Sequence, residues 1–329
     1  MGKQVKIYLV LTTISVALAL TGCGNSRLLL SQEAASGSLP DAVELTATPF
    51  FAQEDYQCGP AALATVLNDS GVAVAPDELV ARLYIPERRG SLQVELLAAA
   101  RTAGRVAYVI DADLRAVMAE LDAGRPVLVL QNLGLGFAPV WHYAVVVGYD
   151  TAAGMLVLRS GGTQRKAVSA TRFRRTWADG GNWAMVVLAP GELPTAPDET
   201  RYLQAATAME TADQSSAAVA AFTAAVENWP DSPTALFGLA NAYYAIDDLR
   251  AAHDTLLLAL ERDPDNPAIL NNLAQVLLEQ ERCVDARDTI DRAVATSASQ
   301  PSLRDAINDS RAQIYRRCGT DSSPNSAGI

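Results

Sequence analysis

The residues best able to do covalent chemistry are a cysteine and a histidine that lie far apart in the chain. Cys58 precedes Gly59-Pro60 and the apolar run AALATVL, which predicts a thiol at the N-terminus of a helix. The positive end of the helix dipole and the unpaired N–H groups there favour the thiolate, which is the nucleophilic form of cysteine. The alternative is a small buried residue, which is the commoner role of a free cysteine.

A histidine and a glutamine could complete a site around this thiol. His142 opens the run HYAVVVGYD, and a histidine at a strand end that faces a helix N-terminus can act as a base for a cysteine. Gln53 lies five residues before Cys58, where its amide could help the Cys58 backbone N–H to hold an oxyanion. Gln57 is a weaker candidate for that role. The other histidine, His253, is more simply a solvated surface residue.

The segments around these residues predict helices first and strands afterwards. Helices are predicted over 60–68, 76–84, 91–104 and 114–124, and strands over 125–133, 142–150, 154–160 and 182–190. This order favours an α+β domain with an antiparallel sheet over residues 44–188. The mostly polar stretch 23–43 is predicted to be a tether, and the proline-rich stretch 189–200 a linker.

Beyond the linker, the chain repeats itself with a period of 34 residues. Three positions of one repeat recur in the next, namely Leu239, Ala240 and Ala252 as Leu273, Ala274 and Ala286. Alanine at close-packing positions and proline at the junctions resemble the tetratricopeptide repeat, with a capping helix after about residue 298. The resemblance implies an all-α solenoid over 201–318 whose concave face binds a peptide or a partner protein. A helical spacer is the plainer alternative.

The first residues have the composition of an export signal. Two lysines precede an apolar run, 7–20, that is short for a membrane-spanning helix. The run ends in LTGC, which resembles a bacterial lipobox and implies a signal peptide over 1–22 and acylation of Cys23. Because Gly24 follows rather than aspartate, the resemblance implies an outer-membrane anchor on the periplasmic side. Ordinary secretory cleavage nearby is the alternative.

The cysteine count and the net charge narrow the possibilities. Export permits disulfides, and Cys283 and Cys318 are the natural pair because both fall in the C-terminal region. With Cys23 used by the lipid, Cys58 remains as the free thiol. The net charge of −11, without basic clusters, argues against nucleic acid as a partner.

An ordered set of motifs carries a family resemblance. The motifs Q-x4-CGPAALATVL, GSLQVELLAAARTAG, GRPVLVLQN and WHYAVVVGYD follow one another over about 48–188 as in bacteriocin-processing, double-glycine-type cysteine peptidases. The resemblance implies a papain-like fold in which Cys58 is the nucleophile, His142 the general base and Gln53 the oxyanion residue, with no metal and no cofactor. With the lipobox and the repeats, the chain resembles a bacterial lipoprotein subfamily identified as cysteine peptidases.

One position departs from that family, which usually orients its histidine with an aspartate just after the next strand. Here the next strand ends in Arg159-Ser160-Gly161. Ser160 could orient the ring by a neutral hydrogen bond, or a backbone carbonyl could. Asp150 is the nearest acid in sequence, but it lies eight residues beyond His142. A Cys/His dyad can act without a third acid because a thiolate forms more readily than an alkoxide.

The sequence is therefore compatible with three functions. The first is a lipid-anchored periplasmic cysteine peptidase that hydrolyses peptide or protein substrates, with the repeats recruiting the substrate or a partner protein. The second is an inactive peptidase-like domain that binds peptides, and the third is an acyltransferase that uses the same Cys/His pair. Hydrolysis and transfer share one acyl-enzyme. The presence of Cys58, His142 and Gln53 together favours chemistry, whereas the missing aspartate favours binding.

Overall fold

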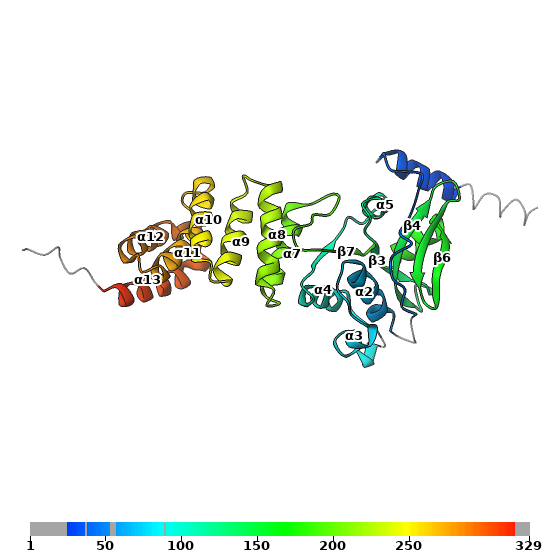
Figure 1. Ribbon diagram of the computed structural model, residues 1–329, viewed down its shortest axis with the longest axis horizontal. Helices are drawn as coiled ribbons and strands as arrows, with labels where there is room; N and C mark the ends of the chain where they lie inside the picture. Colours follow the sequence, from blue (N-terminus) through cyan, green and yellow to red (C-terminus); the bar gives the residue numbers. More distant parts are fainter. Residues whose placement is uncertain (1–24, 37, 53–56, 89, 320–329) are drawn as a thin grey trace, which may run out of the picture. The chain divides into compact units, whose positions relative to one another are not determined.

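A computed structural model of the chain describes residues 25–36, 38–52, 57–88 and 90–319 (Figure 1). The chain divides into two compact units, of which the first ends at Ala189 and also includes Leu193–Asp198. The second contains Pro190–Glu192 and continues from Glu199. The predicted signal peptide, Cys23 and Gln53 lie outside the described residues. In the described part of the chain, no helix combines the length and the hydropathy needed to cross a membrane.

A seven-stranded antiparallel sheet is the frame of the first unit. Its strands run in the order β2-β7-β3-β4-β5-β6, and β1 pairs with β4. The bounds are β1 (Ala42–Glu44), β2 (Val106–Val109), β3 (Val127–Asn132), β4 (Trp141–Asp150), β5 (Met155–Ser160), β6 (Thr163–Ser169) and β7 (Ala184–Leu188). The predicted α+β domain with an antiparallel sheet is confirmed.

Helix α2 packs directly against this sheet. The helices of the unit are α2 (Cys58–Asp69), α3 (Pro76–Leu83), α4 (Gln93–Thr102), α5 (Leu114–Asp122) and α6 (Ala170–Ala178). All residues of α2 from Gly59 to Leu67 are buried. They share one core with Tyr143, Val145 and Val147, the alternate residues of β4 that point to the same face of the sheet. This packing fixes the N-terminus of α2 beside the start of β4.

The structure differs from the tether predicted over 23–43. Residues 25–36 form a helix, drawn in blue in Figure 1. Its residues Ser26, Leu30 and Ala34 recur at a spacing of four and are almost completely buried. The Ser26 hydroxyl also bonds to a threonine of α6 at 2.9 Å. This narrow stripe makes the helix amphipathic, but one of its members is a serine and the exposed Leu28 lies outside it, so the sequence shows no clear period.

Part of the predicted linker, 189–200, is bound to the first unit by hydrogen bonds. Glu120 of α5 is buried, and its Oε1 accepts hydrogen bonds from the Thr195 backbone N–H and hydroxyl at 2.7 and 2.8 Å. Its Oε2 pairs with Arg125 at 2.6 Å. The Asp198 N–H donates to the Tyr108 hydroxyl. Residues 193–198 are therefore bound to the first unit, and proline content alone is a poor guide here.

The second unit consists of stacked helix pairs. Its helices are α7 (Glu199–Glu210), α8 (Ser215–Asn228), α9 (Pro233–Ala245), α10 (Leu249–Arg262), α11 (Pro267–Glu279), α12 (Cys283–Thr296) and α13 (Arg304–Cys318). Proline begins α9 and α11, after side-chain caps from Ser232 and Asn266. The repeat alanines are buried between neighbouring helices. A Cys283–Cys318 disulfide, with Cα atoms 5.4 Å apart, joins α12 to the end of α13.

Candidate active site

Cys58 is the first residue of α2 and the only cysteine outside a disulfide among the described residues. It is half-buried. The next residue lies so close to the loop before α4 that a Cβ on Gly59 would approach the Ser91 Oγ to 2.5 Å. Glycine thus permits the close approach that places the thiol against the sheet. Gln57 precedes the helix, and its side chain makes no capping hydrogen bond.

The thiol contacts the strand that carries the histidine. The backbone N–H groups of Tyr143, Gly59 and Cys58 itself interact with the Cys58 sulfur and favour its charged form. Tyr143 directly follows His142 in β4, so the helix N-terminus meets the strand at this point. The Tyr143 hydroxyl donates to the Ser91 carbonyl at 3.2 Å, and its ring lies edge-on to Trp183 at 6.0 Å. Tyr143 is not among the site residues that the sequence predicts.

The prediction that the helix N-terminus lowers the pKa of Cys58 is wrong. Burial raises the pKa of Cys58 above its ordinary value, and this effect outweighs the opposing effect of the three backbone N–H groups. A helix terminus lowers a thiol pKa most when the charged form remains solvated. Here the sulfur packs against the core of α2 and the sheet. The resting group is therefore the thiol at neutral pH.

His142 is held by Ser160 rather than by an acid. Its Nε2 lies 2.9 Å from the Ser160 Oγ, at the buried end of the neighbouring strand β5. Asp150 lies at the other end of β4, eight residues or about 27 Å along the strand. There its carboxylate accepts the Ala153 N–H and closes the turn to β5. Of the two predicted candidates, the structure brings only Ser160 to the histidine.

The imidazole is neutral in this environment. Burial and, to a smaller extent, the nearby charge of Lys166 together lower the pKa of His142 to about 4. Lys166 pairs with Leu158 across β5 and β6. A serine partner carries no charge that would stabilise the imidazolium. Cys58 and His142 are thus a neutral thiol and a neutral imidazole at pH 7.

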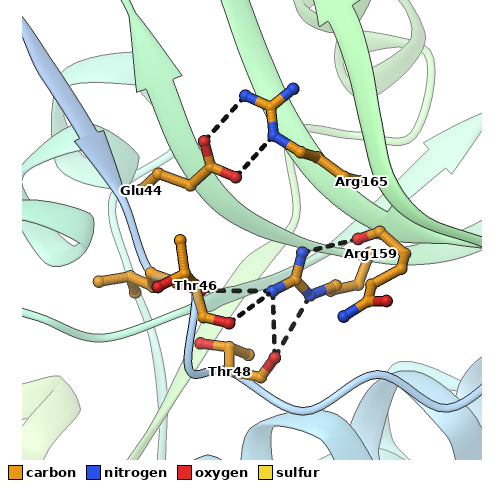
Figure 2. Close-up of polar contacts among 7 residues, drawn as sticks. Glu44, Thr46, Thr48, Arg159 and Arg165 are labelled. Atoms are coloured by element: carbon orange, nitrogen blue, oxygen red, sulfur yellow. Dashed lines mark hydrogen bonds and ion pairs between the residues drawn. The ribbon is translucent and has the colours of Figure 1, made fainter.

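Arg159, the residue before Ser160, ties β5 to the chain segment that leads toward α2. It is 5% exposed, and Figure 2 shows its guanidinium among the carbonyls of that segment. It donates to Thr48 O at 3.1 and 3.3 Å and to Gln164 O at 2.7 Å, with longer bonds to Leu45 O and Thr46 O. These partners fix the strand end that presents Ser160.

A second candidate site lies on the repeats. A cavity of about 300 Å³ is bordered by residues of α9, α11 and α13, among them Asn241, Asn272, Gln275 and Gln313. The Asn272 side-chain amide donates to the Asn241 side-chain oxygen Oδ1 at 2.8 Å. Side-chain amides both donate and accept hydrogen bonds. They can therefore pair with the main chain of an extended peptide.

Comparison with known families identifies both units. Residues 45–185 match the Peptidase C39-like family, and residues 202–254 and 239–301 match the tetratricopeptide repeat. The chain therefore contains a C39-like peptidase domain followed by tetratricopeptide repeats. No curated protein matches the chain.

Solved structures resemble the two units separately. A protein from Bacillus anthracis described as a C39-like peptidase is 18% identical, with a TM-score of 0.38, over 45% of this chain and 98% of its own. The secretion translocator chaperone SycD of Yersinia enterocolitica is 14% identical, with a TM-score of 0.35, over 37% and 95%. The TPR2B domain of yeast Sti1, in complex with pHsp70, is 18% identical, with a TM-score of 0.34, over 36% and 94%.

Proposed function

We propose that the first unit is a cysteine peptidase domain in which Cys58 and His142 act as a pair. The observation that carries this proposal is the contact of the Cys58 thiol with the Tyr143 N–H, directly beside a histidine whose ring is fixed by Ser160. With Nε2 engaged by the serine, Nδ1 is the ring nitrogen left to exchange a proton with the thiol. The match to the Peptidase C39-like family supports this assignment.

The reaction begins from the neutral pair. His142 accepts the thiol proton as the sulfur adds to the peptide carbonyl carbon, and the carbonyl oxygen becomes an oxyanion. The Cys58 backbone N–H, which has no partner within a helix at this position, and the Gln53 amide would hold this oxyanion. The imidazolium then protonates the leaving amine, and a thioester remains. Water hydrolyses the thioester with His142 as the base, which releases the acid and restores the thiol.

A catalytically weak or inactive domain that binds peptides is the second candidate. It is favoured by the raised pKa of Cys58 and the depressed pKa of His142, because both oppose formation of the thiolate–imidazolium pair. Acyl transfer to an amine, from the same thioester, is a variant of the first candidate. The two outcomes differ only in the group that attacks the thioester.

A peptide-cleavage experiment separates these functions. The full-length chain would be incubated with a pool of peptides from a bacterial protein digest, with and without an added amine. New termini would be identified by mass spectrometry. We expect free carboxyl termini with the unmodified chain and none with Cys58→Ala. Amide-capped termini would indicate transfer. Absence of any cut, together with peptide binding by Cys58→Ala, would contradict the peptidase function.

We also propose that acylated Cys23 anchors the chain on the periplasmic side of the outer membrane and that the repeats recruit a substrate or a partner protein. The helix at 25–36, which would follow the lipid directly, packs at the Gly154 turn, the end of β4 opposite His142. An anchored chain would thus hold its active site away from the bilayer. Labelling by a palmitate analogue, lost in Cys23→Ser, tests the anchor.

The lining of the repeat cavity suggests which kind of ligand the repeats would bind. Its amide lining suits an extended peptide of the substrate or partner. We expect Asn272→Leu to reduce capture of peptides while leaving cleavage of short peptides at the first unit unchanged. Equal loss of both activities would contradict separate roles for the two units.

A further inference from the structure

The hairpin between β3 and β4 ends in an exposed apolar cluster, called here the hairpin tip (residues 133–141). Its large side chains are exposed to solvent, namely Leu133 (44%), Leu135 (61%), Phe137 (87%), Val140 (56%) and Trp141 (55%). Residues 126–149 contain no aspartate, glutamate, lysine or arginine. A contiguous exposed apolar surface of this kind marks a binding surface in a folded protein.

The hairpin tip is built as an ordered structure. The Asn132 side-chain oxygen accepts hydrogen bonds from the N–H groups of Gly134 and Val140 at 3.0 and 2.9 Å. Leu135 and Ala138 exchange two backbone hydrogen bonds across the turn. A side chain at Gly134 would collide with the Ala138 carbonyl oxygen at 2.3 Å. These bonds hold the apolar side chains outward at little further entropic cost on binding.

The hairpin tip lies next to the residue that would protonate the leaving amine in the proposed reaction. Trp141 is the first residue of β4 and directly precedes His142. In the proposed mechanism His142 protonates the leaving amine, which belongs to the part of the substrate after the cut bond. The side chains of Trp141 and His142 alternate across the strand, but both lie at the strand end where the hairpin tip begins, which is the end nearest to the amine that His142 would protonate.

We propose that the hairpin tip binds apolar side chains of a peptide substrate, immediately C-terminal to the bond that is cut. This proposal rests on the proposed function and specifies its substrate class. A lipid surface fits less well, because the helix that would follow the anchor packs at the opposite end of β4. The hairpin tip has no charged side chain of its own, so it matches an apolar segment better than a charged one.

Peptide binding by a chemically silent chain tests the proposal independently of catalysis. Full-length Cys58→Ala would be used to select twelve-residue peptides from a phage-displayed random library. We expect selected peptides to be rich in leucine, isoleucine, methionine and phenylalanine. Adding Phe137→Ser should weaken their binding about tenfold. Adding Leu28→Ser instead, at an exposed leucine of the 25–36 helix, should leave binding unchanged. Phe137 contributes little to the core, so folding is expected to persist.

Cut-site mapping then locates the bound side chains. With Cys58 intact, bonds followed by a large apolar residue should be cut preferentially, and Phe137→Ser should remove this preference while cuts before small residues continue. Binding that depends on Phe137 without any cleavage would support the hairpin tip and overturn the peptidase function. Binding unaffected by Phe137→Ser would overturn the hairpin-tip proposal. The hairpin-tip proposal would also be overturned if Phe137→Ser kept peptide binding and lost only self-association. The same holds if it lost only binding to phosphatidylethanolamine–phosphatidylglycerol vesicles.

Discussion

At its first residues, β4 carries an exposed tryptophan and a half-buried imidazole bonded to a neutral serine, whereas at its last residue an aspartate closes a turn packed against the 25–36 helix. The first end holds features that lower stability, including exposed apolar side chains and an ionisable ring without a counter-charge. The second end holds an ordinary turn and a helix with one buried stripe. This difference within one strand agrees with the proposal that the His142 end serves binding and chemistry, while the Asp150 end serves stability.

The largest expected effect is on catalysis at the His142 end. We expect His142→Ala to lower the rate of peptide cleavage at least about 100-fold, because the thiol loses its base and the leaving amine its acid. Asp150→Ala, at the other end of the strand, should change the rate by less than about twofold and reduce stability by about 1 kcal/mol. Initial rates on one identified peptide provide the comparison, and equal losses in the two variants would contradict it.

The Asp150 end should instead respond strongly in stability. Leu30 is fully buried in the 25–36 helix, and Leu30→Ala should lower the free energy of unfolding of the first unit by about 2–5 kcal/mol. Leu28→Ala, exposed on the same helix, should cost less than about 0.5 kcal/mol. Urea unfolding followed by tryptophan fluorescence measures both. If Leu30→Ala lowered the free energy of unfolding no more than Leu28→Ala does, the 25–36 helix would not be part of the folded unit.

The first unit should become less stable as the pH falls, because His142 takes up a proton more readily in the unfolded chain. The pKa of His142 is about 4 in the folded chain and about 6.5 in an unfolded chain. The unfolded state therefore binds more protons between these values, and the contribution of the neutral ring is present above pH 6.5 and lost as the pH falls toward 4. This contribution is about 3 kcal/mol, from a pKa difference of about 2.5 at about 1.4 kcal/mol per unit. Urea unfolding at pH 7 and pH 4.5 should show a smaller decrease in His142→Gln.

A smaller effect is expected from restoring a charge beside the ring. Ser160→Asp should raise the pKa of His142, because an opposite charge within hydrogen-bond distance stabilises the imidazolium. The acid limb of the pH–rate profile should move upward from near 4, and cleavage at pH 7 should increase about tenfold. Ser160→Asn, a neutral change of similar shape, serves as the control. An equal increase with asparagine would show that geometry, rather than charge, limits the rate.

Much of the fold could be predicted because it depends on local patterns. The 34-residue period and the apolar runs of β3, β4, β5 and β7 identify the main helices and strands. Strand β6 and helix α6 were missed, since β6 is mostly exposed and α6 is rich in arginine. Strand β6 shows no apolar alternation, whereas α6 buries Ala170, Phe173 and Trp177 at a helical spacing that its arginines obscure. The 25–36 helix has only a narrow buried stripe, and one of its three members is a serine.

The site could be predicted only as far as residue types allow. Cys58, His142 and Ser160 have recognisable positions relative to a helix or strand end. The direction of the Cys58 pKa depends on burial by the sheet, and all partners of Arg159 except Gln164 O are backbone carbonyls more than 100 positions away. Tertiary contacts of this kind leave no trace in local sequence.

The most direct test of the Cys58–His142 pair is an NMR pH titration of the His142 ring in the full-length chain, compared with Cys58→Ala. The chain has only two histidines, so the ring resonances can be assigned with His253→Gln. The account predicts a midpoint near pH 4 and ring resonances that shift when the thiol is removed. A midpoint near the ordinary value of about 6.5, with resonances unaffected by the loss of Cys58, would contradict the pair.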